Sequence, residues 1–405
     1  MMRKRTPLLA ALLTGLLFFF CGNSFAATVD TDPLNRDPQV RDGFARFYIM
    51  DYDGALTIFD KVQRAHPDDP IATDYLLYTT LFKELYRLDL LDTTFYANDG
   101  FLTGRHTVVE DQHVRDQIKA LTDKAVDQAS VRLKSNGNDV NALFARGWAK
   151  SLQATYLAMV ERSFSAALKL ATQGRNDHAQ VLKLDPNYVD AKLVVGNYEY
   201  VIGALPLPFK ILFGFVGIHG SKATGLEMLH DAASRGVISS VEARVCLMLF
   251  LRREAKYQEA TQIAQGLVAE YPRDFLFHLE VANLQKDAGQ GLTAISSYRE
   301  VINSARKPGF FVTTHLELVY FGLGDSLRGQ KMYADSVEAF RTGAYQPTTS
   351  PELKRRCLLA AGEIYDLMHD RDKAKQQYQA VIDAGSDSAQ AEEARKYMKS
   401  PYTKK

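Results

Sequence analysis

The sequence predicts an all-α fold, a right-handed α-solenoid of about eight helix pairs, and three observations lead to this prediction. A frame of small and aromatic residues recurs along the chain. The 26 Gly and 13 Pro stand mostly between apolar stretches, where they mark turns. The composition, 46% hydrophobic and 24% charged, is that of a folded protein, and 405 residues suffice for one long array of repeats.

The recurring frame is clearest around Ala55. Gly43 lies twelve residues before this alanine, and Phe59 lies four residues after it. The same offsets separate Gly362, Ala374 and Tyr378. A small residue in each helix allows its neighbour to approach closely, and the aromatic ring one turn further on fills the adjoining space. Because one pair of helices cannot bury its apolar faces alone, the pairs are expected to stack.

These offsets resemble the tetratricopeptide repeat, a helix–turn–helix unit of about 34 residues. The resemblance implies repeat units at 36–69, 70–137, 140–186, 188–237, 241–274, 275–308, 317–350 and 355–388, with a capping helix at 389–398. We expect the chain to consist of a signal peptide at 1–26, a divergent helical array at 27–240 with inserts at 92–106 and 204–220, and a more regular array with its capping helix at 241–405.

Two inserts interrupt the frame. The first, at 92–106, is rich in aromatic residues and is either a binding loop or an ordered cover that closes the core. The second, at 204–220, is strongly apolar and broken by Pro206 and Pro208, so it is too short and irregular to span a bilayer. It is either a buried connector or a segment that docks a partner or enters a membrane surface.

A narrower pattern lies within 190–255, where a leucine/proline run and a glycine-rich apolar loop precede a helix opening with a Gly-Leu pair. Its residues are Gly196, Asn197, Tyr198, Leu205, Pro206, Leu207, Pro208, Gly214, Phe215, Val216, Gly217, Gly220, Gly225 and Leu226. This pattern resembles the tetratricopeptide repeat protein 39 family, which implies a helical-repeat protein without known catalytic residues. Members of that family are intracellular, so the localisation expected for this chain rests on its own N-terminus.

The N-terminus has the pattern of an export signal. Three basic residues at 3–5 precede an apolar run at 8–20, and Ser24 and Ala26 are the small residues expected before a cleavage site. We therefore expect a mature chain that begins near Ala27 and is exported, to the periplasm or cell envelope of a Gram-negative-type bacterium. An uncleaved membrane anchor is the alternative.

Three cysteines occur in the chain. A lipid on Cys21 is disfavoured because the bulky Phe20 precedes it. Cys246 and Cys357 lie in apolar helical patterns far apart in the sequence, which favours two small buried residues, although an oxidising compartment also permits a disulfide. No cysteine spacing suggests a metal site.

Charge and motifs exclude several classes of function. The net charge of +1 falls to about −2 without the basic residues of the signal, which leaves no basic field for nucleic acid. Motifs of metalloproteases, α/β-hydrolases, dinucleotide-binding folds and P-loops are absent. His106 and His113 lie near Glu110 and Asp111, but their spacing does not place both on one helical face. We therefore expect no enzyme, no catalytic residue, no metal and no cofactor.

The partner site is expected on the concave face, which the first helix of each unit lines. The frame places there Phe144, Trp148, Leu152, Asn197, Tyr200, Arg252, Arg253, Asn283, Lys286, Phe321, Asp325 and Arg328. The predicted partner-binding site consists of Trp148, Tyr200, Arg252, Arg328, Asn197 and Asn283. Aromatic and arginine side chains are chosen because they dominate interface energetics.

Two further considerations shape this site. Trp148 has an alternative interpretation as a core residue between repeats. Arg252 and Arg328 are expected at the surface, because unpaired charge is rarely buried. A chaperone-type clamp for a terminal carboxylate is not supported, since Leu193 and Leu279 stand where such a clamp needs lysine.

The sequence therefore predicts an exported scaffold that binds a protein or peptide partner through its concave groove, without catalysis and without nucleic acid. The alternative is a membrane-associated envelope assembly factor that uses the apolar 204–220 insert, so peripheral membrane contact stays open.

Overall fold

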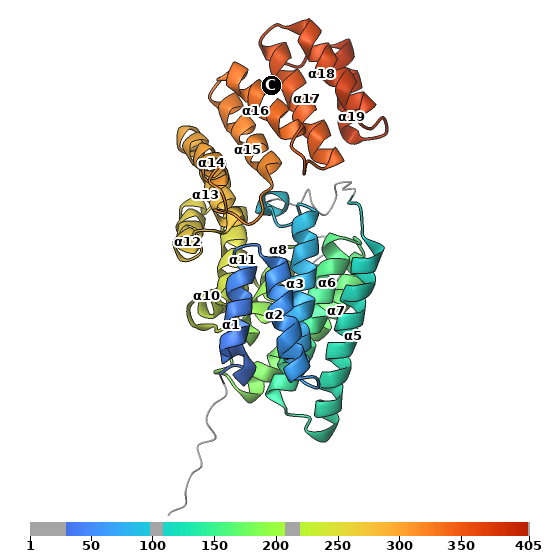
Figure 1. The fold of residues 1–405 in the computed structure, drawn as a ribbon, viewed down its shortest axis with the longest axis vertical. Helices are drawn as coiled ribbons and strands as arrows, with labels where there is room; N and C mark the ends of the chain where they lie inside the picture. The colour runs from blue at the N-terminus through green and yellow to red at the C-terminus, as the bar shows by residue number, and fades with distance from the viewer. Residues whose placement is uncertain (1–29, 98–107, 207–218, 404–405) are drawn as a thin grey trace, which may run out of the picture.

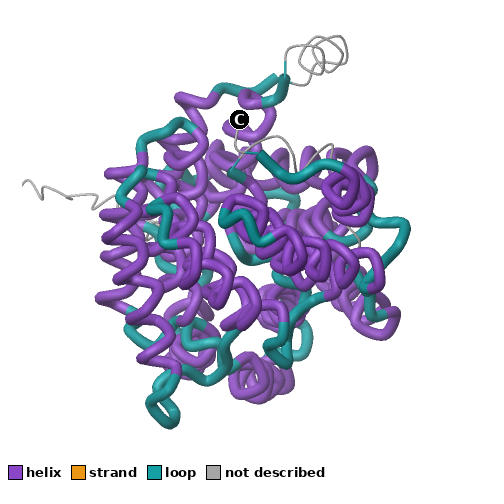
Figure 2. Tube along the Cα trace, turned by 90° about the horizontal axis from the view of Figure 1, so that it is seen from above, coloured by secondary structure: helices purple, strands orange, loops and turns teal. Residues whose placement is uncertain are grey.

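The computed structural model describes residues 30–97, 108–206 and 219–403. These residues form 17 α-helices and two short 3-10 helices, with no strand in the described ranges (Figures 1 and 2). The all-α prediction is therefore confirmed for this part of the chain, while the handedness of the solenoid and the number of pairs stay predictions.

The N-terminal half contains eight α-helices and both 3-10 helices of the described residues. Its elements are η1 (Pro33–Arg36), α1 (Pro38–Phe47), α2 (Tyr52–Ala65), α3 (Pro70–Arg87), η2 (Thr93–Tyr96), α5 (Gln112–Ser135), α6 (Val140–Met159), α7 (Phe164–Leu184), α8 (Ala191–Ala204) and α10 (Lys222–Arg235). The side chains of Asp37, Asp51 and Asp69 accept backbone N–H bonds in the first turns of α1, α2 and α3. Such caps satisfy donors that the helix itself leaves unpaired, so local sequence sets these helix starts.

The C-terminal half has shorter connections. Its elements are α11 (Ser240–Arg253), α12 (Tyr257–Glu270), α13 (Phe275–Asp287), α14 (Gly291–Ala305), α15 (Leu316–Gly329), α16 (Tyr333–Ala344), α17 (Pro351–Leu367), α18 (Arg371–Asp383) and α19 (Ala389–Lys399). The last of these is the capping helix, which was expected at 389–398. Consecutive helices pack as hairpins that stack on one another (Figure 1).

One turn geometry recurs between the two helices of a pair. A residue with left-handed backbone stands two positions before the second helix at Met50 (φ 65°), Arg162 (58°), Ala255 (57°), Gly289 (76°), Lys331 (60°) and His369 (61°). A non-glycine residue in this conformation costs about 1–3 kcal/mol, so its recurrence at one position marks a repeated unit. Asp89 (φ 60°) has the same conformation after α3, but the 92–106 insert follows it instead of a helix.

Glycine in the first helix meets an aromatic ring of the second helix sixteen residues later. A Cβ atom added to Gly43 would lie 2.4 Å from the ring of Phe59, and one added to Gly362 would lie 2.5 Å from the ring of Tyr378. Gly324 and Phe340 form the same pair, at 2.9 Å. These contacts are the physical reason for the small-residue frame in the sequence.

The pairs wind so that helices distant in sequence lie side by side. α11 lies beside α1 (Figure 1), and the turn after α3 contacts the start of α15. One cluster of buried residues runs from Leu34 to Phe277 and another from Phe275 to Ala394. The first cluster has members on both sides of position 240, where the sequence suggested a division, and that division stays a prediction.

Several expectations fall on residues outside the described ranges. These are the signal peptide, most of the 204–220 insert and the larger part of the 92–106 insert, including His106. Within the described residues, no helix combines the length and the apolar character needed to cross a membrane. Cys246 and Cys357 are free thiols, and burial raises the pKa of each to about 12, which fits small residues within the helical packing.

Candidate functional site

Side chains fill the inner side of the N-terminal part, where α1 and α3 face α11. Glu242 of α11 accepts hydrogen bonds from the Tyr48 hydroxyl of α1, at 2.6 Å, and from the Tyr78 hydroxyl of α3. The rings of Tyr48 and Tyr271 lie with their centroids 4.8 Å apart. The cavity left between these helices measures about 20 Å³, room for about one water molecule. A partner segment therefore finds no open groove here.

Trp148 of α6 lies inside this closed region. Its side chain is 8% exposed, and its ring centroid lies 5.5 Å from that of Tyr78 and 6.0 Å from that of Phe144. The prediction that Trp148 forms an exposed groove floor is wrong, and the alternative of a core residue holds. The cause is the packing of α6 against α3, the first helix of the preceding unit, which places Trp148 against the rings of Tyr75 and Tyr78.

Tyr200 is also a core residue. It is 1% exposed, its ring stacks on Phe250 with centroids 3.8 Å apart, and its hydroxyl donates to Glu254 Oε1 at 2.8 Å. Asn197, on the same helix, is half-buried. Because Tyr200 and Trp148 belong to different buried clusters, the structure does not bring them together on one open surface as predicted.

Arg252 is buried, which contradicts the expectation that it is an exposed anchor. It is 3% exposed, and its guanidinium donates to Thr93 Oγ1 at 2.7 Å, to Glu280 Oε1 at 3.1 Å and, through Nε, to Asp287 Oδ2 at 2.7 Å. Arg252 was expected at the surface because unpaired charge is rarely buried, but this charge is paired with Glu280 and Asp287.

Asn283 is also buried. It is 3% exposed, and its Oδ1 atom accepts a hydrogen bond from the Tyr298 hydroxyl at 2.6 Å. An exposed position for Asn283 on the concave surface is therefore also wrong. Like Arg252, it lies close to the first residues of the 92–106 insert, since its Nδ2 atom donates to Asp92 Oδ1 at 3.4 Å.

Arg328 remains at the surface, and its side chain is 24% exposed. Its Nη1 atom lies 2.7 Å from Glu363 Oε2, and its Nη2 atom donates to the Tyr402 hydroxyl at 2.8 Å. The Tyr402 ring lies under the guanidinium, with 5.2 Å between Cζ and the ring centroid. Whether Arg328 contacts a partner stays a prediction.

An inner surface does remain between α13, α15 and α17. We call it the C-terminal inner face and define it by the half-buried side chains of Lys286, Phe321, Asp325, Arg328 and Arg356. The Arg356 guanidinium lies over the Phe321 ring, with 4.5 Å between Cζ and the ring centroid. Lys286, Phe321, Asp325 and Arg328 are among the residues that the repeat frame placed on the concave face, whereas Arg356 is not, and only Arg328 belongs to the predicted partner-binding site. Whether a partner binds here stays a prediction.

The 92–106 insert contributes to the edge of this surface. Phe95 of η2 lies on the same guanidinium, with 5.9 Å between Arg356 Cζ and the Phe95 ring centroid. The two rings and the arginine come from three separate parts of the chain. Both interpretations of this insert, as a binding loop and as an ordered cover, therefore apply at the C-terminal inner face.

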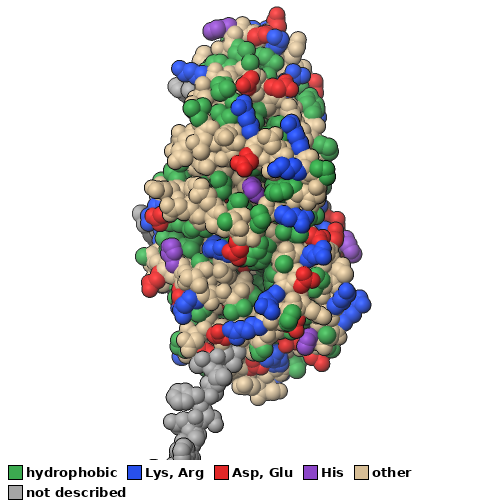
Figure 3. All heavy atoms as spheres, turned by 60° about the vertical axis from the view of Figure 1, so that its left-hand side comes forward, with side chains coloured by type: hydrophobic (Ala, Val, Ile, Leu, Met, Phe, Trp, Pro, Cys, Tyr) green, Lys and Arg blue, Asp and Glu red, His purple; other side chains and the backbone are tan. Residues whose placement is uncertain are grey.

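Charge on the C-terminal inner face is unevenly paired. Burial raises the pKa of Asp325, while the nearby cations Lys286, Arg328 and Arg356 oppose that rise. Among the described residues, no carboxylate lies within ion-pairing distance of Lys286 or Arg356. On the molecular face in Figure 3, basic, acidic and apolar side chains are interspersed, so that face presents no extended patch of one sign.

Arg356 is a residue that the sequence prediction missed, although a signal for it existed. It occupies the second position of the 355–388 unit, and this position faces the concave surface in the repeat frame. Phe95 offered no comparable signal, because an insert has no frame from which a side-chain direction can be read.

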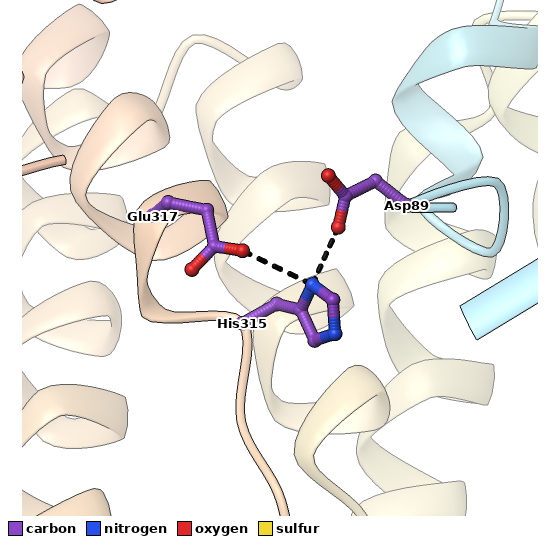
Figure 4. Close-up of side chains that lie close together, drawn as sticks. All are labelled: Asp89, His315 and Glu317. Atoms are coloured by element: carbon purple, nitrogen blue, oxygen red, sulfur yellow. Dashed lines mark hydrogen bonds and ion pairs between the residues drawn. The ribbon is translucent and has the colours of Figure 1, made fainter. Parts of the chain in front are cut away.

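One group of side chains within the described ranges has the donors of a metal site. Asp89, His315 and Glu317 are all buried, and one ligand atom from each lies within 4.8 Å of the others (Figure 4). The sequence analysis weighed His106 and His113 and predicted no metal site there; His113 lies exposed near the start of α5, and His106 is outside the described residues.

Comparison with known proteins supports the repeat assignment. Residues 189–341 match the family model described as Iml2/Tetratricopeptide repeat protein 39. This range includes residues 190–255, where the sequence resembles that family. No curated protein matches the chain.

Solved structures similar to this chain include the APC/C hetero-tetramer Cut9-Hcn1, with 13% identity and a TM-score of 0.49 over 92% of this chain and 57% of that one. Yeast Tom70 matches with 12% identity and a TM-score of 0.40 over 88% and 87%, and Pseudomonas aeruginosa PilF with 15% and 0.39 over 64% and 99%. The chain thus spans little more than half of the first of these proteins. Together, the family match and the recurring helix pairs identify the chain as a tetratricopeptide-repeat-type protein.

Proposed function

We propose that this protein is an exported interaction scaffold whose C-terminal inner face binds a protein segment carrying acidic and apolar side chains. Tetratricopeptide-type folds are typically non-catalytic scaffolds for protein–protein interaction, which supports the general role. The choice of surface follows from the closure of the inner face between α1 and α11, which leaves the face of α13, α15 and α17 for a partner.

The observation that carries the proposal is the state of Arg356. Its guanidinium is half-buried against Phe321 and Phe95, yet it forms no ion pair with a described residue. An arginine held flat on aromatic rings is preorganised to bind a carboxylate with two parallel hydrogen bonds. Arginine and aromatic residues are also the types that carry most binding energy at interfaces.

The neighbouring charges favour the same ligand. Lys286 also lacks an ion-pair partner among the described residues, and burial raises the pKa of Asp325 against the opposing effect of Lys286, Arg328 and Arg356. Three cations thus surround one carboxyl group on this face. An acidic side chain of the partner would pair with Arg356, while an adjacent apolar side chain would pack on Phe321.

The proposal includes the absence of catalysis, of a cofactor and of nucleic acid as partner. It rests on the missing catalytic motifs and on the net charge near zero. A membrane-associated role for the 204–220 insert has no supporting observation in the described residues.

Export is the part of the proposal that rests on the sequence alone. The basic, apolar and small-residue regions at 1–26 support a cleaved signal. We expect Edman sequencing of the protein recovered from its host envelope fraction to give a mature N-terminus within one residue of Ala27. Recovery of the chain with Met1 retained would contradict the cleaved signal.

The partner proposal is tested with a displayed random-peptide library selected on the chain beginning at Ala27. We expect the selected peptides to be enriched in Asp or Glu next to an apolar residue. Their affinity, measured by calorimetry, should fall about tenfold in Arg356→Gln, which is the usual loss for an interface anchor. It should also weaken as salt is added, because the contact at the rim is electrostatic.

Arg299→Gln is the matched control, since Arg299 lies on α14 with its side chain 53% exposed. Its variant should bind the peptides as the parent does, and both variants should keep the parent's melting temperature within a few degrees. Peptides without acidic enrichment, or peptides that bind Arg356→Gln as tightly as Arg299→Gln, would place the partner site elsewhere.

A further inference from the structure

The contact between the two halves of the chain at Asp89, His315 and Glu317 has the geometry of a metal site. His315 Nδ1 lies 2.5 Å from Asp89 Oδ1 and 3.1 Å from Glu317 Oε1 (Figure 4). Both carboxylates point at the same ring nitrogen, and the three side chains are 9%, 8% and 0% exposed. Three ligand atoms thus converge on one small buried point.

Hydrogen bonding alone leaves this arrangement incomplete. Nδ1 carries at most one proton, and that proton can point directly at only one of the two carboxylates. Asp89 Oδ1 lies closer, and Glu317 Oε1 is fully buried without a hydrogen-bond partner. A buried carboxylate oxygen with no donor is costly, so its position calls for a further positive group.

The net charge of the cluster also favours a bound cation. Two carboxylates and a protonated imidazole leave one uncompensated negative charge in a buried site. Two carboxylates, a neutral imidazole and a divalent cation sum to zero, and every converging lone pair then has a partner.

We propose that Asp89, His315 and Glu317 bind one divalent transition-metal ion of the Zn²⁺ type, which clamps the turn after α3 to the start of α15. One imidazole nitrogen with two carboxylate oxygens suits Zn²⁺ and its first-row neighbours. Ligand bonds of about 2.0–2.2 Å at tetrahedral angles place ligand atoms about 3.4 Å apart, so the Nδ1 and Oδ1 atoms, now 2.5 Å apart, must separate by about 1 Å to admit the ion.

The surrounding residues hold the ligands as metal sites require. Thr348 Oγ1 donates to the other oxygen of Glu317 at 2.5 Å, which fixes the carboxylate's direction. The recurrent turn presents Asp89, whose positive φ is the same as in the other pairs. The Tyr86 ring meets the imidazole edge to face, with centroids 4.3 Å apart.

Two of the three ligands, Asp89 and His315, lie 226 residues apart in the chain. An ion bound here would therefore fix the regular C-terminal array relative to the closed N-terminal part. The ion would hold the two parts in one arrangement. None of its ligands belongs to the partner surface around Arg356.

The test is titration of the chelator-treated protein with Zn²⁺ at pH 7.5 by calorimetry, and with Co²⁺ by visible absorbance. We expect saturable binding of one ion per chain, d–d bands of Co²⁺ bound by N and O donors, and a rise in melting temperature. The imidazole must be neutral to bind, so binding should weaken as the pH is lowered.

Variants separate this site from adventitious binding. His315→Ala and Glu317→Gln should abolish saturable binding, and Thr348→Ala, which removes only the bond that positions Glu317, should weaken it about 10–100-fold. His230→Ala, at an exposed histidine of α10, is the matched control and should bind as the parent does. Parent protein that binds neither ion saturably, or equal binding in Glu317→Gln, would overturn the proposal and leave the cluster as an ion pair. Because the parent titration needs no variant, the proposal stays falsifiable even if His315→Ala fails to fold.

Discussion

Replacing Arg252 by alanine is expected to lower the free energy of unfolding by about 3–5 kcal/mol at pH 7, the usual cost of removing one partner of a buried ion pair. The guanidinium is 2% exposed and pairs with Glu280 and Asp287, so its loss leaves both carboxylates without their cation. Thr93 also loses a hydrogen bond that ties the insert to α11. Denaturant unfolding followed by circular dichroism measures the change.

The same variant should show a distinct pH dependence. Burial raises the pKa of Glu280 from 4.5 to about 7, while Arg252 pulls it down. A carboxyl with a higher pKa in the fold than in the unfolded chain destabilises the fold as the pH rises from its unfolded value through its folded one. Without Arg252 the folded pKa rises further, so the deficit of the variant should be smaller at pH 5 than at pH 8.

Arg299→Ala serves as the control for Arg252→Ala. Its guanidinium is 53% exposed and lies 3.9 Å from Asp335, which is itself 57% exposed. Exposed pairs of this kind contribute about 0–1 kcal/mol, so the control should stay close to the parent. A loss below about 1 kcal/mol in Arg252→Ala would mean that this arginine is not buried among carboxylates as described.

The helices and their pairing could be predicted from sequence because their causes are local. Asp51 caps α2 four residues after the last residue of α1, and Gly43 meets Phe59 within the same hairpin. Such contacts span sixteen residues or fewer, and they repeat, so a frame found once can be extended. The second unit departs from it only because the insert after Asp89 delays the next long helix to Gln112.

The candidate site could be predicted only in part, because exposure depends on contacts between distant segments. The frame assigns Trp148 and Arg252 to the inner side of their helices. Whether that side is open depends on how tightly the solenoid winds, and the frame holds no information on winding. The contact of α1 with α11, and the insert residue Thr93 beside Arg252, turn a predicted surface into a core.

The metal-capable cluster illustrates the same limit. His315 lies in the connection before a repeat unit, and Asp89 lies in a turn 226 residues earlier. Neither is near another histidine or cysteine at a ligand spacing, so sequence spacing alone could not bring them together. His315 and Glu317 are two residues apart, and only the winding of the chain brings Asp89 beside them.

A hydrogen bond across the closed inner face should appear as a large coupling energy between two distant residues. Tyr78 and Glu242 are 164 positions apart, and the phenol of the first donates to the carboxylate of the second. In the parent, Tyr78→Phe removes a donor from a buried carboxylate, which is costly. In the Glu242→Leu background the same change removes a hydroxyl that has already lost this acceptor, so it should cost little.

The most direct test of the closed inner face is therefore the double-mutant cycle of Tyr78→Phe and Glu242→Leu, measured by denaturant unfolding. Closure predicts a coupling energy of about 1–3 kcal/mol, whatever the sign of the single effects. The cycle of Tyr78→Phe with Glu300→Ala, at an exposed position of α14, should be additive within about 0.3–0.5 kcal/mol. Additivity in the Tyr78–Glu242 cycle as well would mean that α3 does not meet α11, that the inner face is open, and that the partner site cannot be confined to the C-terminal inner face.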